Sequence, residues 1–313
     1  MTWGGRLFLA LALLATAAAG PAGAATLTVG PGQAYALPSQ AIAAARDGDT
    51  VAIAPGTYHD CAIVRRNRLT IEGTGPGAVL SGRSCAGKGI LIIDANDVTV
   101  KDLTLQGARV PDGNGSGIRA EGGGTLTVKG VRFVDNQDGI LAAANPRAIL
   151  RILDSRFVGN GSCANAGGCA HGVYVNTLAE LEVAHTRFFA TREGHSIKSR
   201  ARRTVVKDCT IADGPEGTSS YQIDVPNGGN VLIEGNRLEK GPKSQNRRNA
   251  IMIGEEGVTQ PTKSLVVKDN TLANDTGWPT VFVHNETATP AVLAGNAFKG
   301  AMVVPLVGPG TVR

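Results

Sequence analysis

Apolar residues at alternate positions return in phase along most of the chain. Eight segments align without gaps, and each has this alternation, a short turn and one further apolar residue. Alternation with a period of two is typical of β-strands, so each segment predicts a strand, a turn and a second strand. The segments are "VTVKDLTLQG" (98), "LTVKGVRFVD" (126), "LRILDSRFVG" (150), "LEVAHTRFFA" (181), "TVVKDCTIAD" (204), "VLIEGNRLEK" (231), "LVVKDNTLAN" (265) and "AVLAGNAFKG" (291).

A shorter alternating segment precedes most of these repeats. Its central apolar residue recurs at intervals mostly in the twenties to low thirties. Stretches of Gly, Pro and Asn, which suit turns, carry the variation in length. Each repeat is therefore predicted to form one coil of two or three strands. The central residues are Ile118, Ile140, Val173, Ile197, Ile223, Ile251 and Val281.

One coil cannot bury its apolar face alone, whereas stacked coils form continuous parallel sheets around one core. Asn236, Asn270 and Asn296 occupy one repeat position, which predicts a stacked amide ladder. An antiparallel sandwich is the alternative, but it predicts hairpin turns such as Asn-Gly between adjacent strands. The pattern therefore favours an all-β, single parallel solenoid.

The start of the chain has a different pattern. Arg6 is followed by the thirteen-residue apolar run "LFLALALLATAAA" and a small-residue "AGA", as in a secretory signal peptide, which we assign to residues 1–24. Residues 25–60 are predicted to form an N-terminal cap with a helix at about 40–46, for which Ser39 is the expected N-cap. The helix would cover the open end of the solenoid, whose coils are assigned to 61–313.

Export sets the expected location and partners. No later segment is apolar enough to cross a membrane, so the mature protein is predicted to be periplasmic or extracellular and monomeric. Loss of Arg6 lowers the net charge of +5 to about +4, which favours an anionic partner without identifying it. With 4% aromatic residues and no motif that reads bases, nucleic acid is a poor candidate.

All five cysteines lie after the predicted signal peptide, and an exported chain meets an oxidising compartment. Cys163 and Cys169 flank a short turn-rich segment and are expected to form a local disulfide. Cys61 and Cys85 lie about one repeat apart and are expected to pair between neighbouring coils. Cys209 remains, and its repeat position predicts a buried thiol, with a reactive thiol as the alternative.

The stretch "AIAAARDGDTVAIAPGTYHD" followed by "LTIEGTG" resembles the opening of right-handed parallel β-helix proteins of the pectate-lyase-like superfamily. With the repeats, the resemblance covers nearly the whole mature chain. It implies a right-handed parallel β-helix that binds polysaccharide across the outside of one sheet. It does not imply one activity, because the fold carries lyases, hydrolases, epimerases and non-catalytic proteins.

If the central apolar residues point inward, their neighbours along the strand point outward. Polar and titratable residues then concentrate in three consecutive coils, with more apolar coils on either side, as expected of a sugar-binding groove. The expected catalytic residues are Lys198, Tyr174, His195 and Tyr221. The expected substrate-binding residues are Arg200, His171, Asn176, Gln222, Asp224, Phe282 and His284.

Cleavage of a uronate polymer by β-elimination needs a base for the proton beside the carboxylate, positive charge for the carbanion-like state, and a donor for the leaving oxygen. Lys198 is the expected base, because Arg200 with Arg202 or Arg203 would favour its neutral form by like-charge repulsion. A tyrosine or His195 is the expected proton donor. The non-catalytic alternative is that Lys198 forms an exposed cross-strand pair with Asp224.

The segment "EGHSIKS" also resembles the alginate lyase and chondroitinase B group of β-helix lyases. That resemblance implies Lys198 as the base and Glu193 as an acidic calcium ligand. The chain departs from the group at two places. Asp224 or Pro226 stands where the group has a catalytic arginine, and Thr191 lies near the place of a second acidic ligand. No cofactor is therefore expected with certainty, and calcium is the one implied.

The predicted function is a lyase acting on an acidic, uronate-containing polysaccharide. The main alternative is a non-catalytic, glycan-binding protein of the cell envelope. A uronate epimerase would share the same lysine, tyrosine or histidine chemistry. A hydrolase would need two carboxylates around the scissile bond, and Asp138 and Asp224 are expected about 14 Å apart at the usual strand spacing.

Overall fold

The computed structural model describes residues 1, 3, 23–164 and 168–313. The predicted signal peptide, residues 1–24, falls almost entirely outside these residues. Within the described chain, no helix is long and apolar enough to cross a membrane.

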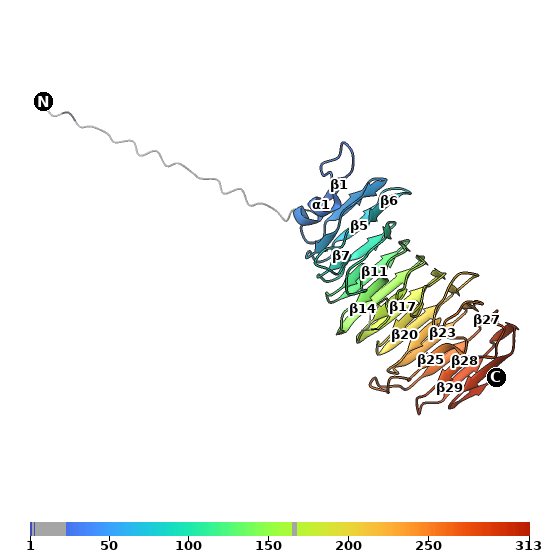
Figure 1. Ribbon diagram of the computed structural model, residues 1–313. Coiled ribbons are helices and arrows are strands. Elements are labelled where there is room, and N and C mark those ends of the chain that lie inside the picture. The colour runs from blue at the N-terminus through green and yellow to red at the C-terminus, as the bar shows by residue number, and fades with distance from the viewer. Residues whose placement is uncertain (2, 4–22, 165–167) are drawn as a thin grey trace.

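The strands form three parallel sheets, which we call A, B and C, and each coil passes through them in that order. Figure 1 shows the coils stacked along one axis. Sheet A contains β1 (Thr26–Val29), β2 (Thr50–Ile53), β5 (Thr70–Gly73), β8 (Thr99–Lys101), β11 (Thr125–Lys129), β14 (Asn145–Leu153), β17 (Leu178–Ala184), β20 (Arg203–Lys207), β23 (Asn230–Glu234), β26 (Leu265–Lys268), β29 (Ala291–Ala294) and β32 (Gly310–Val312).

Sheets B and C complete each coil, so the predicted coil of two or three strands has three. Sheet B contains β3 (Gly56–Tyr58), β6 (Ala78–Ser81), β9 (Thr104–Gln106), β12 (Arg132–Val134), β15 (Arg156–Val158), β18 (Arg187–Phe189), β21 (Thr210–Ala212), β24 (Arg237–Lys240), β27 (Thr271–Asn274) and β30 (Ala297–Gly300). Sheet C contains β4 (Ala62–Val64), β7 (Gly89–Ile93), β10 (Ser116–Ala120), β13 (Asp138–Ala142), β16 (Val173–Val175), β19 (Ile197–Ser199), β22 (Ile223–Val225), β25 (Asn249–Ile253), β28 (Thr280–Asn285) and β31 (Val303–Val307).

The turn from sheet A to sheet B needs one residue in the left-handed region. Eight consecutive coils place Asp, Gly or His there, with φ between 51° and 69°. These residue types tolerate that conformation better than others do. The turn therefore explains the recurrent "KD" and "KG" of the sequence repeats. The eight residues are Asp102, Gly130, Asp154, His185, Asp208, Gly235, Asp269 and Gly295.

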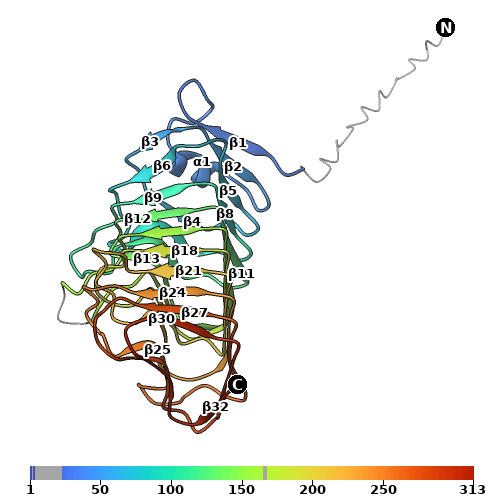
Figure 2. The same ribbon diagram turned by 90° about the vertical axis from the view of Figure 1, so that its right-hand side faces the viewer.

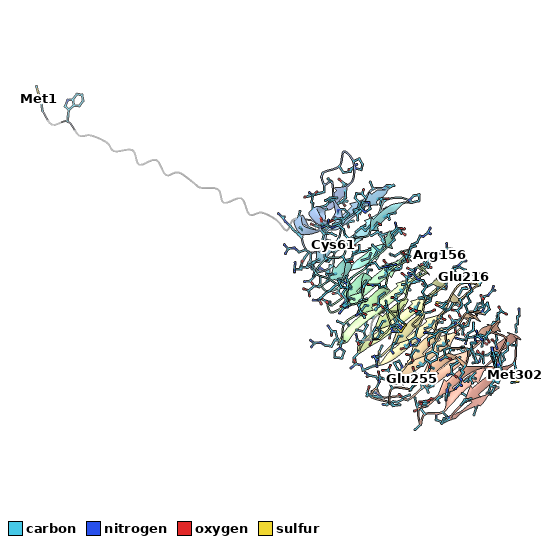
Figure 3. The ribbon with its side chains drawn as sticks, in the orientation of Figure 1. Met1, Cys61, Arg156, Glu216, Glu255 and Met302 are labelled. Atoms are coloured by element: carbon cyan, nitrogen blue, oxygen red, sulfur yellow. A yellow bond between two sulfur atoms is a disulfide. The ribbon has the colours of Figure 1, made fainter. Side chains whose placement is uncertain are left out.

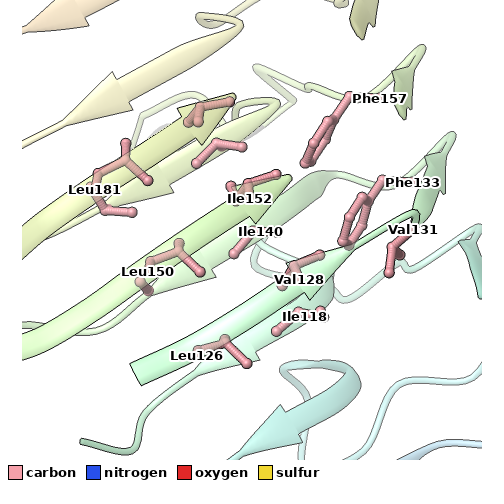
Figure 4. Packing of buried hydrophobic residues seen from close by; sticks show 14 of the residues in the cluster. Ile118, Leu126, Val128, Val131, Phe133, Ile140, Leu150, Ile152, Phe157 and Leu181 are labelled. Atoms are coloured by element: carbon pink, nitrogen blue, oxygen red, sulfur yellow. The ribbon is translucent and has the colours of Figure 1, made fainter. Parts of the chain in front are cut away.

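The core runs along the solenoid axis, and the predicted inward column from Ile118 to Ile251 is fully buried. Phe133, Phe157 and Phe188 of sheet B stack inside it, with ring centroids 4.5 Å apart at each step. Figure 4 shows Phe133 and Phe157 beside the aliphatic residues of sheets A and C. Glycines face these rings, because a Cβ on Gly139 would lie 2.6 Å from Phe157. The phenylalanines thus fill the space that the glycines leave.

The predicted inward column is wrong by two residues in β28. Ile251 pairs with Val283, and not with Val281 as the alternation suggested. Phe282 is consequently buried in the core, 5.2 Å from Phe298 between ring centroids, so the expectation that it faces a substrate is wrong. Because these three consecutive residues of β28 are all apolar, alternation alone does not determine which of them point inward.

The predicted amide ladder is confirmed. Asn236 Nδ2 donates to Asn270 Oδ1 at 2.9 Å, and Asn270 Nδ2 donates to Asn296 Oδ1 at 3.0 Å. Cys209 lies one coil before Asn236, and its backbone N–H donates to Asn236 Oδ1 at 2.9 Å. Its thiol is buried and unpaired, and burial raises its pKa to about 12. The structure therefore favours the buried thiol over the reactive one.

The helix α1 spans Pro38–Ala44, two residues earlier than predicted. Its N-cap is Leu37, so the assignment of Ser39 is wrong. Proline suits the first helical position because it has no N–H to leave unsatisfied. Ser39 lies inside the helix, where its backbone N–H donates to Asp60 Oδ2 at 2.7 Å.

The helix packs on the first coil, as expected of a cap. Ala41 and Ile42 are buried, and the helix contacts β1, β2 and β4. Figure 2 shows α1 at the N-terminal end of the stacked strands. The apolar face of the helix therefore covers the end of the core.

Both predicted disulfides are formed. Cys61 pairs with Cys85, with Cα atoms 5.6 Å apart, and joins the first coils beside the helix. Cys163 pairs with Cys169 across the short segment outside β16. Figure 3 marks Cys61 near the N-terminal end of the solenoid, far from Glu255.

Candidate active site

A groove of about 1140 Å³ lies along the outer face of sheet C, over its middle coils. All four predicted catalytic residues line it, as do three of the predicted substrate-binding residues. Arg119 and Leu141 belong to its N-terminal part, and Glu255 and Glu256 to its C-terminal part. The seven predicted residues in its lining are His171, Tyr174, Asn176, His195, Lys198, Arg200 and Tyr221.

One wall of the groove is a ladder of side chains at the strand starts of sheet C. Asp138 Oδ1 accepts the backbone N–H of His171 at 2.7 Å. His171 Nδ1 accepts that of His195 at 2.9 Å, and His195 Nδ1 accepts that of Tyr221 at 3.2 Å. The rings of His171, His195 and Tyr221 stack with centroids 4.8 Å apart. Each side chain thus satisfies the backbone of the next coil.

This ladder fixes the tautomer of His195. Because Nδ1 accepts an N–H, the neutral ring carries its proton on Nε2. Burial, with a further contribution from Lys198, lowers the pKa of His195 to about 3. Burial and the charge of neighbouring groups likewise hold the pKa of His171 well below its usual value. Both rings are neutral near pH 7, so His195 is poorly suited to the proton-transfer role predicted for it.

Lys198 lies in the middle of the groove, and its side chain is 10% exposed. Its Nζ lies 2.7 Å from Glu256 Oε1 and 3.4 Å from Asp224 Oδ2. Arg200 lies nearby and shares Glu256 with Lys198, but the direct contacts of Nζ are to carboxylates rather than to the expected arginines. Arg203 pairs instead with Glu180 of sheet A. The contacts of Lys198 Nζ are thus to two carboxylates.

Arg200 and Tyr174 form the neighbouring part of the groove. Arg200 Nη1 lies 2.6 Å from Glu256 Oε2, and its Nε donates to the Tyr174 hydroxyl at 3.2 Å. Arg200 also donates to Asn227 Oδ1. Burial would lower the pKa of Arg200, but the hydrogen bonds to Glu256 and Tyr174 outweigh it and raise the pKa. Because the Tyr174 oxygen accepts from Arg200, its own proton is available to the groove.

Asp224 lies beneath the groove and does not line it. The residue is fully buried, and neither carboxylate oxygen has a hydrogen-bond partner among the described residues. The alternative from the sequence, an exposed pair of Lys198 with Asp224, is wrong because both residues are buried. Burial raises the pKa of Asp224 to about 7, although Lys198 acts in the opposite direction. Asp224 is therefore partly protonated at neutral pH.

Glu255 and Glu256 are the functional candidates that the sequence analysis missed. They follow Gly254, the first residue after β25, and lie outside the strand segments that the repeat pattern singled out. Tyr221 donates its hydroxyl proton to Glu255 Oε2 at 2.9 Å. The only signal in the sequence is two adjacent acidic residues after a strand of the sheet that carries Lys198. That signal is weak, because such residues are usually solvated.

Three other predicted residues lie away from the groove. Gln222 is buried under it and donates to Asp213 Oδ2 at 3.1 Å, so its expected place on the substrate face is wrong. Glu193 is also misplaced, because its carboxylate accepts the backbone N–H of Cys163 and faces a separate hollow. His284 lies on the outer face but near Glu286, with 3.7 Å between Nε2 and Oε1.

One cluster at the floor of the groove has the composition of a metal site. Ligand atoms of His195, Asp224 and Glu255 lie within 4.8 Å of one another. The His195 tautomer does not fit, because Nε2, the nitrogen 3.5 Å from Asp224, carries the proton and has no lone pair for a metal. Lys198 already places a positive charge 3.4 Å from Asp224. Calcium also prefers a set of about six to eight oxygen ligands. These residues therefore do not fit a metal ion.

Comparisons with known proteins agree with the fold. No family model matches the chain, and no curated protein matches its sequence. An alginate lyase from Paenibacillus sp. str. FPU-7 has a similar structure, with 16% identity, a TM-score of 0.54, and coverage of 90% of this chain and 99% of that one. The PL6 family alginate lyase AlyGC gives 15% identity and a TM-score of 0.52 over 90% of this chain, which spans 40% of that protein. The predicted fold, a right-handed parallel β-helix, is confirmed.

Proposed function

We propose that the protein is an exported lyase that cleaves an acidic, uronate-containing polysaccharide by β-elimination in the groove of sheet C. One observation carries the proposal. Lys198, Arg200 and Tyr174 meet within one open groove, where they supply a base, a cation and a hydroxyl donor. These are the three groups that elimination beside a carboxylate requires. The likeness to two alginate lyases and the presence of two disulfides support the assignment and the export.

In this reaction, Lys198 Nζ takes the proton from the carbon beside the uronate carboxylate. The electron pair forms a carbon–carbon double bond as the bond to the glycosidic oxygen breaks. Arg200 neutralises the carboxylate while negative charge develops on it. A general base must be neutral when it takes the proton, and protonation of Asp224 removes one of the two carboxylate charges beside Lys198 Nζ. The pKa of Asp224, about 7, makes this possible at neutral pH.

Tyr174 is the proposed donor to the leaving oxygen. Its oxygen accepts from Arg200 Nε, which also stabilises the phenolate formed when the proton leaves. Tyr221 is less suited, because its hydroxyl proton is donated to Glu255 and burial raises its pKa further. Proton donation is therefore assigned to Tyr174 rather than to Tyr221 or His195.

A glycoside hydrolase is the alternative for which the folded chain offers a closer pair of carboxylates than the sequence suggested. Oxygens of Asp224 and Glu255 lie within 4.8 Å, near the separation of about 5 to 5.5 Å typical of retaining glycosidases. Asp224, however, is fully buried beneath Lys198 and cannot reach a sugar without rearrangement. Asp138, the other carboxylate considered from the sequence, is also fully buried. The geometry therefore favours elimination.

The proposal is tested by incubating the purified protein with alginate, pectate and glycosaminoglycans and following the ultraviolet absorbance of the unsaturated product. We expect a steady rise on at least one of these polymers. No rise on any of them would contradict elimination and favour a non-catalytic, glycan-binding protein.

The same assay tests the role of calcium. Because the cluster of His195, Asp224 and Glu255 does not fit a metal ion, we propose that elimination needs none. Pre-treatment with excess EDTA followed by its removal should leave the initial rate within about twofold of the untreated protein. Loss of the rate on chelation and recovery with calcium alone would contradict this.

A further inference from the structure

Two cations of the groove, Lys198 and Arg200, hold the carboxylate of Glu256. One of its oxygens lies 2.7 Å from Lys198 Nζ and the other lies 2.6 Å from Arg200 Nη1. Burial would raise the pKa of Glu256, but the hydrogen bonds to these two cations outweigh it and lower the pKa. The carboxylate is therefore ionised at neutral pH and pairs with both cations.

The loop that carries Glu256 is held by its backbone rather than by this side chain. Glu256 N–H donates to Pro226 O at 3.0 Å, and Asn227 Nδ2 donates to Gly257 O at 3.0 Å. Thr259 N–H donates to Asn227 O at 3.1 Å. The Glu256 side chain is itself 38% exposed. The carboxylate can therefore leave the cations by side-chain rotation, without loss of the backbone contacts.

A uronate residue presents the same group to the groove. Its carboxylate is planar, carries one negative charge and has two acceptor oxygens, as Glu256 has, and a guanidinium binds either one in the same way. A neutral sugar has no group that replaces these contacts. Displacement of Glu256 therefore selects for a carboxylate-bearing ligand.

We propose that Glu256 is a built-in competitor for the substrate carboxylate, which displaces it from Arg200 and so also releases Lys198 from one of its two counter-ions. This inference rests on the proposed function and identifies, within the same groove, the subsite that recognises the uronate carboxylate. The exchange couples recognition to catalysis, because Glu256 leaves Lys198 Nζ only when an acidic sugar has bound. A neutral glycan leaves Glu256 in place on both cations.

The test compares binding to the wild-type protein, Glu256→Gln and Glu255→Gln by titration calorimetry. The probes are methyl uronides, monosaccharides that carry the carboxylate but have no sugar on the 4-oxygen to eliminate, with the matching neutral methyl glycosides as controls. We expect Glu256→Gln to bind the uronides at least about tenfold more tightly, a change of about 1.4 kcal/mol. Glu255→Gln removes the same charge from the groove without touching Arg200, so its gain should stay below about threefold.

Equal affinity of the wild-type protein and Glu256→Gln for the uronides would overturn the inference. So would an equal gain in Glu255→Gln, an equal gain for the neutral glycosides, or no uronide binding by Glu256→Gln. The elimination assay separates this from the proposed function. If the wild-type protein forms unsaturated product but Glu256→Gln binds the uronides no more tightly than the wild type does, the inference is refuted and the proposed function is not. If Glu256→Gln binds the uronides more tightly but the wild-type protein forms no unsaturated product from any polymer, elimination is refuted and the inference about Glu256 is not.

Discussion

Replacement of Lys198 by alanine is expected to lower the rate of elimination by about 10²- to 10⁴-fold, the usual contribution of a general base. The loss should appear in kcat, because Arg200 still binds the carboxylate. Lys198→Arg should be as inactive, since a guanidinium keeps the positive charge but does not give up its proton. The measurement is the initial rate of formation of the unsaturated product.

Lys207→Ala is the matched control, because Lys207 lies on sheet A and pairs with Glu234 at 3.1 Å, away from the groove. Its rate should stay within about twofold of the wild type, as for an ordinary surface pair. Thermal unfolding of all three variants checks that they are folded. A Lys198→Arg protein with near wild-type rate would contradict the base assignment and show that positive charge at this position is sufficient.

Replacement of Phe157 by alanine is expected to lower the free energy of unfolding by about 3 to 5 kcal/mol. The ring is buried and stacks on Phe133 and on Phe188, at 4.5 Å from each. The parallel strands on either side prevent the coils from closing over the lost volume, because their hydrogen bonds set the strand spacing. Chemical denaturation measures the change.

Arg156→Ala is the control in the same strand, since Arg156 is exposed on the outer face of sheet B. Its free energy of unfolding should change by less than about 0.5 kcal/mol. A loss below about 1 kcal/mol in Phe157→Ala would contradict the packing described for the core, because it would mean that the ring stack contributes little.

Much of the fold can be predicted from the sequence, because one physical pattern repeats in every coil. Alternation gives the strands, the "KD" and "KG" turns give the corners, and Asn236 with Asn270 gives the ladder. The prediction fails in β28, where three adjacent apolar residues leave the inward positions open. It also fails at Ser39, because a proline at the first helical position moves the helix start.

The candidate site is only partly predictable, because the sequence gives the strand on which a residue lies but not its partners. Lys198, Arg200 and Tyr174 were found because neighbouring coils bring equal repeat positions together. Glu256 comes from a loop two coils beyond Lys198, and no repeat pattern reports that its side chain turns back over the sheet. The sequence therefore suggested cations around Lys198, whereas the folded chain surrounds it with carboxylates.

Proton NMR of the digestion in D₂O tests the central claim most directly, because it distinguishes elimination from hydrolysis and from epimerisation. Elimination predicts one olefinic proton signal for each new reducing end, and Lys198→Ala should remove both signals together. New reducing ends without an olefinic proton would indicate hydrolysis. Inversion with deuterium uptake and no cleavage would indicate epimerisation. Either of these results, or an unchanged spectrum on every uronate polymer, would contradict the account.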